Sequence, residues 1–200
     1  ETISGIVGKE KVVGGTTSQG ATVLGLGHVT HAGRGETTIG ELDGSLSPRV
    51  KGISNIFNSV GIETKITDDV EGLVWSKLLI NVGINALTAV LRLKNGELVE
   101  YSWARELLRM AVEEAVLVVK ARGIRLTYED PIKRVEDVCR ATATNVSSML
   151  QDVLRAKKTE IDYINGAIVS EGQRLGISVP ENKTLTGIVK TVEMSYEKRL

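Results

Sequence analysis

Three polar residues recur at four-residue intervals within a strongly apolar segment: Lys77, Asn81 and Asn85. Most of their neighbours between residues 73 and 90 are aliphatic, which predicts a buried helix. On such a helix the three side chains share one face, about 6 Å apart. An ammonium group there can protonate a carbonyl oxygen as it becomes an alkoxide, while amides hold neighbouring oxygens. The spacing therefore indicates a site for a small carbonyl or anionic substrate.

The same pattern also has a purely structural interpretation. Lys77 can extend to solvent from a partly exposed stripe, and the two asparagines can cap other helices. Gly83, inside the same segment, costs a helix about 1 kcal/mol relative to alanine, so we expect a ligand or another backbone to approach closely there. The spacing alone leaves the catalytic and the structural interpretation open.

The composition is that of a neutral chain: 200 residues carry 25 basic and 25 acidic side chains. Because no global field attracts nucleic acid or acidic membranes, neither is an expected partner. No run of about 18 uninterrupted apolar residues predicts a membrane span, and no basic-then-apolar leader predicts secretion. The single cysteine, Cys139, fits a reducing compartment. We therefore expect a cytoplasmic protein. The first residue is Glu1 and not methionine, which is compatible with a piece of a longer chain.

The chain changes character near residue 68. Before this point, segments rich in β-branched residues alternate with glycines, and after it helical periodicity dominates. Strands are expected at residues 11–17, 21–26, 28–31, 37–41 and 62–67, with one helix at 47–60. Further helices are expected at residues 69–91, 103–122, 131–144, 147–157 and 160–175, and from 180 almost to 200. The pattern predicts an α+β fold of two domains, residues 1–68 and 69–200, in which the first βαβ unit of an α/β domain is missing.

Four segments at ordered spacing resemble the ketopantoate reductases. They are WSKLLINVGINALTA (75–89), NGEL (95–98), NVSSMLQD (145–152) and TEIDYING (159–166), preceded by residues 15–21 and 38–40, which are similar to the closing strands of that family's nucleotide-binding domain. The Lys-x-x-x-Asn pair by itself would be weak evidence for this family, because related hydroxyacid dehydrogenases share it. The order and spacing of the whole set make the resemblance specific.

This resemblance implies a fold and an activity. Residues 1–68 would be the C-terminal remnant of a Rossmann NADP-binding domain. Residues 69–200 would be an all-helical substrate-binding domain, similar to the C-terminal domain of 6-phosphogluconate dehydrogenase. The implied reaction is the reduction of 2-dehydropantoate (ketopantoate), a small 2-oxo acid, to pantoate on the route to pantothenate and coenzyme A. The implied cofactor is NADPH, with NADH as the alternative.

The resemblance also implies roles for individual residues. Lys77 is expected to be the general acid that protonates the ketone oxygen as hydride arrives at carbon. The expected substrate ligands are Asn81, Asn85, Asn95 and Ser148, and the expected cofactor contacts are Glu160 and the backbone around Ala21. Taken singly, two of these have structural alternatives: Ser148 as a neutral surface residue, and Glu160 as a helix-terminal charge behind a Thr159 N-cap.

One feature of the family is missing. A Rossmann domain receives the pyrophosphate on a Gly-x-Gly-x-x-Gly turn at a helix N-terminus, and no segment here supplies it. Gly25-Leu26-Gly27, for example, has no third glycine in register. We infer that about 100 residues are absent and expect the chain alone to be a poor dehydrogenase. Its uncovered sheet edges favour pairing with another chain, for which a homodimer is one form.

Two other functions stay open at this point. One is a related NAD(P)-dependent hydroxyacid dehydrogenase that accepts a different acid, and the other is a non-catalytic helical dimerisation module. No metal site is expected, since His28 and His31 have no cysteine or carboxylate cluster near them. Cys139 is expected to pack in a helix rather than act as a nucleophile. Trp75 and Trp103 are expected to be core anchors.

Overall fold

The computed structural model describes residues 2–33 and 35–198, which form two compact units, Glu1–Val74 and Trp75–Leu200. The amino-terminal unit contains α1 (Thr2–Val7), the 3₁₀ turn η1 (Lys9–Lys11), β1 (Val13–Thr17), β2 (Gly20–Gly25), β3 (His28–Gly33), β4 (Thr37–Glu41), α2 (Pro48–Ser59), β5 (Thr64–Ile66) and the start of α3 (Val70–Leu91). The helical unit continues with α4 (Glu97–Glu100), α5 (Ser102–Ala121), α6 (Pro131–Ala141), α7 (Ser148–Leu154), η2 (Ile161–Tyr163), α8 (Asn165–Leu175), α9 (Pro180–Met194) and η3 (Tyr196–Lys198).

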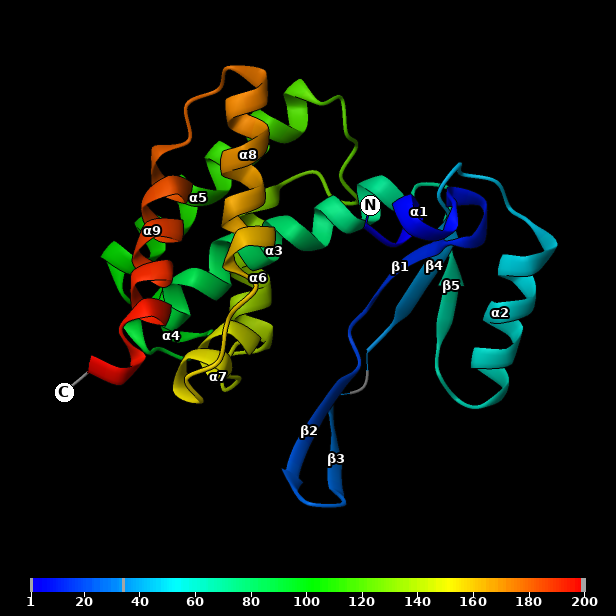
Figure 1. Cartoon of the computed structure of the whole chain (residues 1–200), viewed down its shortest axis with the longest axis horizontal. Coiled ribbons are helices and arrows are strands. Elements are labelled where there is room, and N and C mark those ends of the chain that lie inside the picture. Colours follow the sequence, from blue (N-terminus) through cyan, green and yellow to red (C-terminus); the bar gives the residue numbers. More distant parts are fainter. Residues whose placement is uncertain (1, 34, 199–200) are drawn as a thin grey trace. The chain divides into compact units, whose positions relative to one another are not determined.

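The amino-terminal unit is built on a three-stranded sheet in the order β1-β4-β5 (Figure 1). β1 pairs antiparallel with β4, so that Val13 lies opposite Glu41, and β4 pairs parallel with β5. β2 and β3 form a separate antiparallel hairpin that extends from the sheet (Figure 1). The parallel β4-α2-β5 connection is the kind of unit from which doubly wound α/β domains are made.

Helix α2 is joined to the sheet at both ends by polar side chains. At its start the hydroxyl of Ser47 accepts the amide of Val50 at 3.1 Å, which is the arrangement of an N-cap. The buried carboxylate of Glu41, at the end of β4, accepts hydrogen bonds from Ser47 and Arg49. At its other end Asn58 exchanges side-chain hydrogen bonds with the backbone of Thr64 in β5. These bonds set the crossover from β4 to β5.

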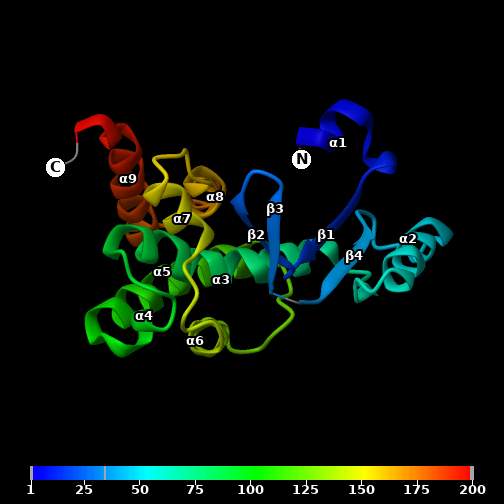
Figure 2. The same cartoon turned by 90° about the horizontal axis from the view of Figure 1, so that it is seen from below.

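The helical unit is organised around α3, which runs through the middle of the unit in both views (Figures 1 and 2). Its apolar side chains are enclosed by α5, α6, α7, α8 and α9, and one core cluster joins all of these helices. The largest completely buried aliphatic side chains of this core include Leu79, Leu87, Leu108, Met149 and Ile168. The expectation of a buried, largely apolar helix at residues 69–91 is confirmed.

By length and composition alone, α3 is apolar enough to cross a membrane. In the structure, however, 61% of its most apolar window is buried inside the protein. A helix that other helices of the same bundle already enclose is the ordinary core helix of a folded domain. Its hydrophobicity is accounted for by packing.

Gly83 permits the close packing of α3 against two neighbouring helices. A Cβ atom at this position would lie 2.8 Å from Cγ2 of Val112 in α5 and 2.8 Å from Cγ1 of Val135 in α6. The expected close approach is therefore made by neighbouring side chains rather than by a ligand or a backbone. The cost of a helical glycine is offset by the contact that it permits.

The fold class expected from the sequence is confirmed: a few amino-terminal strands of a partial Rossmann region precede a helical domain. The differences are local. Residues 97–100, for which no helix was expected, form the short helix α4, and the segment expected as one helix from residue 160 to 175 is interrupted at Ile164. Helix α1 was not expected. Trp75 is buried as expected, whereas Trp103 is 81% exposed and is no core anchor.

We predict that Gly83→Ala destabilises the protein by about 1–3 kcal/mol, because the new methyl group overpacks the contact with Val112 and Val135. Urea unfolding followed by circular dichroism measures the change. The matched control is Gly187→Ala in α9, where a Cβ atom meets nothing within 4 Å. There the helix propensity of alanine should raise stability by about 0.5–1 kcal/mol. Equal effects of the two substitutions would contradict the packing argument.

A buried carboxylate joins α5 to α6. Glu136 accepts two hydrogen bonds of 2.7 Å from the guanidinium of Arg105 and one of 2.9 Å from that of Arg140. The side chain of Glu136 is 7% exposed and that of Arg105 is 44% exposed, so solvent weakens the attraction. The hydrogen bonds from Arg105, more than those from Arg140, lower the pKa of Glu136 below its usual value. The native state therefore favours the ionised carboxylate.

We predict that Glu136→Gln lowers the free energy of unfolding at pH 7 by about 1 kcal/mol. A lowered pKa contributes stability that is complete above the unfolded pKa and lost as the pH falls through the folded pKa. The difference from the parent protein should thus persist from pH 7 to about 5 and shrink below about 4. Urea unfolding at pH 7, 5 and 3 measures it, with exposed Glu113→Gln as the control. A constant difference at all three values would exclude this mechanism.

Candidate active site

The three polar residues of α3 descend from the surface into the core. Lys77 is exposed, Asn81 is half-buried and Asn85 is 6% exposed, with all three spaced one helical turn apart. The face thus presents an ammonium group at the rim and amide groups at increasing depth. This arrangement suits a small molecule that offers a carbonyl oxygen at one end and further polar oxygens below it.

The turn of α3 just before Lys77 is held by the loop after α5. The hydroxyl of Ser76 accepts the amide of Thr127 at 2.8 Å, and the hydroxyl of Tyr128 donates to the carbonyl oxygen of Ser76 at 2.7 Å. Burial raises the pKa of Tyr128 to about 12, so its hydroxyl stays a donor at neutral pH. The guanidinium of Arg122 lies 5.1 Å from the ring centroid of Trp75. These contacts hold in place the backbone from which the Lys77 side chain extends.

The deeper part of the site is joined to α7. The hydroxyls of Thr88 in α3 and Ser147 lie 2.7 Å apart and form a buried hydrogen bond. Ser147 is also the N-cap of α7, since its hydroxyl accepts the amide of Leu150 at 3.1 Å. The next residue, Ser148, is exposed and begins α7. Asn85 is three positions before Thr88, so both expected ligands flank the same interhelical bond.

Asn95 occupies the loop after α3 and is nearly buried. Its amide donates to the carbonyl oxygen of Asn145 at 3.1 Å, and its side-chain Nδ2 donates to the hydroxyl of Thr142 at 2.9 Å. Its Oδ1 atom is buried and has no hydrogen-bond partner. The structure thus brings Asn95 next to the loop before α7, with one acceptor atom uncommitted and its donor group engaged.

Glu160 lies on the surface, in the short segment between α7 and η2. The residue before it, Thr159, is held from both sides: its amide donates to the carboxylate of Glu193 in α9 at 2.6 Å, and its hydroxyl accepts the amide of Ile161 at 3.2 Å. Glu160 itself takes the cap position of η2, without a side-chain cap. The carboxylate is therefore available to hydroxyl donors from a ligand.

Ala21 belongs to the other unit. It lies on the exposed hairpin strand β2, opposite His31 of β3. His31 bonds through Nε2 to the side-chain oxygen of Gln19 at 2.7 Å. The remaining expected site residues, from Lys77 to Glu160, all belong to the helical unit.

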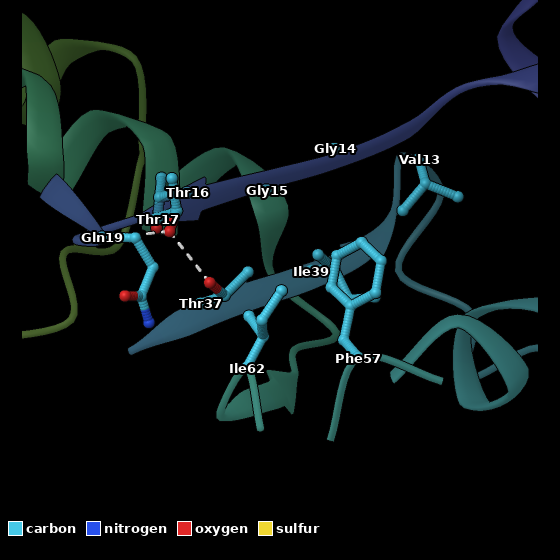
Figure 3. A pocket seen from close by; sticks show the side chains of 10 residues that line it. All are labelled: Val13, Gly14, Gly15, Thr16, Thr17, Gln19, Thr37, Ile39, Phe57 and Ile62. Carbon is cyan, nitrogen blue, oxygen red and sulfur yellow. Dashed lines mark hydrogen bonds between the residues drawn. The ribbon is translucent and has the colours of Figure 1, made fainter. Parts of the chain in front are cut away.

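Both units contain hollows, and the two that are lined mainly by apolar side chains contain none of the expected site residues. In the amino-terminal unit a hollow of about 410 Å³ lies between β1, β4 and α2, where Phe57 and Ile62 face Ile39 and Thr37 (Figure 3). Its lining contains threonine hydroxyls and one glutamine amide but no titratable group. In the helical unit an apolar hollow of about 290 Å³ lies between α3, α5 and α9. Neither lining provides an acid–base pair in an enclosed pocket.

Within residues 2–33 and 35–198, no group of three or more histidine, cysteine, aspartate or glutamate side chains is placed to hold a metal ion. Cys139 is completely buried in α6, as expected for a packing residue. Burial raises the pKa of its thiol to about 12. The thiolate that nucleophilic chemistry requires is therefore disfavoured.

Several residues that shape the site were not singled out from the sequence. Tyr128 and Thr127 lie far from α3 along the chain, and no local signal marks them. Ser147 and Asn165, by contrast, lie inside segments that resemble family motifs, and the motifs themselves were the only available signal. The buried amide of Asn165 donates to the carbonyl oxygen of Val82 in α3 at 3.2 Å.

Comparison with known proteins adds to this geometry. Residues 69–193 match the family described as "Ketopantoate reductase PanE/ApbA C terminal", and residues 1–44 match "Ketopantoate reductase PanE/ApbA". The chain belongs to the ketopantoate reductase family. The 2-dehydropantoate 2-reductase of Archaeoglobus fulgidus is 40% identical over 184 residues, which are 92% of this chain and 61% of that protein.

Solved structures give the same relationship. The crystal structure of a ketopantoate reductase family protein from Ralstonia eutropha JMP134 has a TM-score of 0.85 at 32% identity and covers 93% of this chain and 60% of its own. A complex of D-mandelate dehydrogenase with NADH has a TM-score of 0.89 at 27% identity and covers 96% of this chain and 66% of its own. This member of the ketopantoate reductase family thus spans about three-fifths of the length of the relatives that it matches.

We predict that the thiol of Cys139 in the folded protein reacts with an aromatic disulfide reagent at pH 8 about 10³-fold more slowly than in the urea-unfolded chain. The physical reason is that a pKa near 12 leaves little thiolate at that pH. Release of the chromophore measures the rate, and the unfolded chain is its own control because it contains one cysteine. A fast reaction in the folded state would contradict the burial of this side chain.

Proposed function

We propose that this chain provides the substrate-binding and catalytic part of a 2-dehydropantoate 2-reductase, which reduces ketopantoate to pantoate for the synthesis of pantothenate and coenzyme A. The observation that carries the proposal is the polar face of α3, where Lys77, Asn81 and Asn85 descend into the core. The relatives that bear the name of this activity share the family and most of this chain.

Lys77 acts as the general acid in this proposal. As hydride reaches the carbonyl carbon of the keto acid, the C=O π electrons move to oxygen, and Nζ of Lys77 donates a proton to that oxygen, which completes the alcohol. Before transfer, the same ammonium group stabilises the developing oxyanion. Its place at the rim of the polar face keeps it close to solvent, from which it is reprotonated.

The amides below Lys77 hold the substrate. Asn81 and Asn85 offer both donors and acceptors, which suits a carboxylate and a hydroxyl group on one small molecule. Ser148, anchored beside α3 through Ser147 and Thr88, adds a hydroxyl. Asn95 contributes its uncommitted Oδ1 atom, since its Nδ2 is already bonded to Thr142.

A reduced nicotinamide nucleotide supplies the hydride when bound, and we propose NADPH, with NADH as the alternative. The chain fits part of such a ligand: the exposed carboxylate of Glu160 suits ribose hydroxyls, and the backbone around Ala21 lies on an exposed strand. The sequence offers no Gly-x-Gly-x-x-Gly turn for the pyrophosphate. We therefore propose that the 200 residues alone are not a competent reductase.

Two further features belong to the same proposal. Biosynthetic chemistry on a small acid, with one buried reduced cysteine, suits the cytoplasm. A homodimer suits the helical unit, in which Leu91, Leu107 and Ile188 are exposed apolar side chains that line the hollow between α3, α5 and α9.

A second candidate is a dehydrogenase of the same architecture that accepts another 2-oxo acid. The observation in its favour is the likeness to D-mandelate dehydrogenase. The TM-score of that structure against this chain is as high as that of the ketopantoate reductase family protein. The polar face of α3 is compatible with either acid, because a carboxylate beside a ketone is common to both. A panel of 2-oxo acids separates the two candidates.

We predict that Lys77→Ala lowers kcat for ketopantoate by about 10²–10⁴-fold in the extended protein, defined as this chain preceded by the amino-terminal residues of the Archaeoglobus fulgidus relative. NADPH oxidation at 340 nm measures the rate. Lys77→Arg should lower kcat to a similar extent, because a guanidinium keeps the charge but does not release a proton near neutral pH. The control is Lys133→Ala, on the exposed face of α6.

Turnover of the extended protein with ketopantoate, lost in both Lys77 variants and kept in the control, supports the proposal. Turnover with a different 2-oxo acid transfers the support to the second candidate. Full activity of Lys77→Ala would remove the general-acid assignment. Absence of nucleotide binding and of turnover in the extended protein would instead favour a non-catalytic module.

A further inference from the structure

A chain of buried hydrogen bonds crosses the helical unit and ends on the backbone of α3. It begins at Glu114 in α5, whose two carboxyl oxygens accept the amides of Glu181 and Asn182 at 3.0 and 2.9 Å. The side chain of Asn182 then accepts Nδ2 of Asn165 at 3.0 Å, and that same Nδ2 donates to the carbonyl oxygen of Val82 at 3.2 Å. Helices α5, α9, α8 and α3 are thereby joined through the carboxylate of Glu114 and the amide side chains of Asn182 and Asn165.

Asn165 is completely buried, and its polar groups are not fully used. Its Nδ2 serves two acceptors, whereas its Oδ1 has no hydrogen-bond partner. A leucine, which has the same branched shape, would remove the unpaired Oδ1 of Asn165, but it would leave the buried Oδ1 of Asn182 without its donor. The asparagine is therefore not explained by packing alone. Its donor group is what a leucine could not provide.

The two ends of this contact lie next to residues with proposed roles. Val82 directly follows Asn81, so the bonded carbonyl belongs to the peptide between Val82 and Gly83 on the substrate helix. Asn165 follows Glu160 by five residues, and the segment between them is fixed at its start by the bond from Thr159 to Glu193. The segment that carries the proposed cofactor contact is thus attached to the helix that carries the proposed substrate contacts.

We propose that Asn165 is a positioning residue that fixes the spacing between Asn81 on α3 and Glu160 before η2. Asn165 itself touches neither substrate nor cofactor. The inference rests on the proposed function only for the identity of the two ligands, the substrate at Asn81 and the cofactor at Glu160. A helix that slides by about 1 Å at Val82 displaces Asn81 from the substrate, and misplacements of that size are costly in enzymes. The closely packed Gly83 makes α3 sensitive to such a shift.

The test removes the donor and keeps the branched shape of the side chain. Asn165→Leu is made in the extended protein beside Ile168→Val, which trims one buried methyl group from the same helix and leaves the amide contacts intact. We expect Asn165→Leu to raise KM for ketopantoate about tenfold with less than about a threefold change in kcat, and Ile168→Val to leave both within about twofold. Should Asn165→Leu not fold, Asn165→Ala takes its place.

Two readouts separate positioning from mere stability. In an Asn81→Ala background, Asn165→Leu should leave KM within about twofold, because the residue through which it acts is already gone. Independently of any turnover, amide hydrogen exchange of residues 83–86 should be at least about tenfold faster in Asn165→Leu than in Ile168→Val.

Each outcome bears on the inference. Equal exchange rates in the two variants, or a full tenfold increase of KM in the Asn81→Ala background, would overturn it, even with an active parent enzyme. An extended protein that ignores ketopantoate would instead count against the proposed function. In that case, faster exchange in Asn165→Leu still supports the attachment of α3, and unchanged exchange overturns it.

Discussion

The enclosure of α3 is the constraint on which the rest of the helical unit depends. A helix with side chains such as Leu79, Val82 and Leu87 around its circumference is stable only when other elements remove most of its apolar surface from water. The surrounding helices do this, and Gly83 lets two of them approach within van der Waals contact. Because the helix cannot turn about its axis in such a core, the one polar face that carries Lys77 has a defined direction.

Buried polar contacts add what apolar packing lacks, namely a fixed register. Hydrophobic contacts are non-directional, whereas the bond between Thr88 and Ser147 and the bond from Asn165 to Val82 each fit one axial position of α3. Burial raises the pKa of Glu114, and its oxygens accept the first amides of α9, so this carboxyl group serves as a cap contributed by another helix. The polar network and the apolar core thus locate the site together.

The amino-terminal unit shows a different balance. Its sheet and α2 are joined by specific polar contacts around Glu41 and Thr64, while the hairpin of β2 and β3 exposes apolar side chains such as Val23 and Leu26. Isolated two-stranded hairpins are marginally stable in water, so such a surface gains from being covered. The chain spans about three-fifths of the length of the relatives that it matches.

The sequence by itself determined the order of strands and helices, the burial of α3 and the common face of Lys77, Asn81 and Asn85, because helical periodicity and β-branching are local properties. It could not reveal that Tyr128 holds Ser76 or that Asn165 holds Val82, since partners 52 and 83 positions apart meet only after the helices pack. Nor could it predict that Trp103 is exposed while Trp75 is buried: both are large and apolar, and only the neighbouring helices decide which of them is covered.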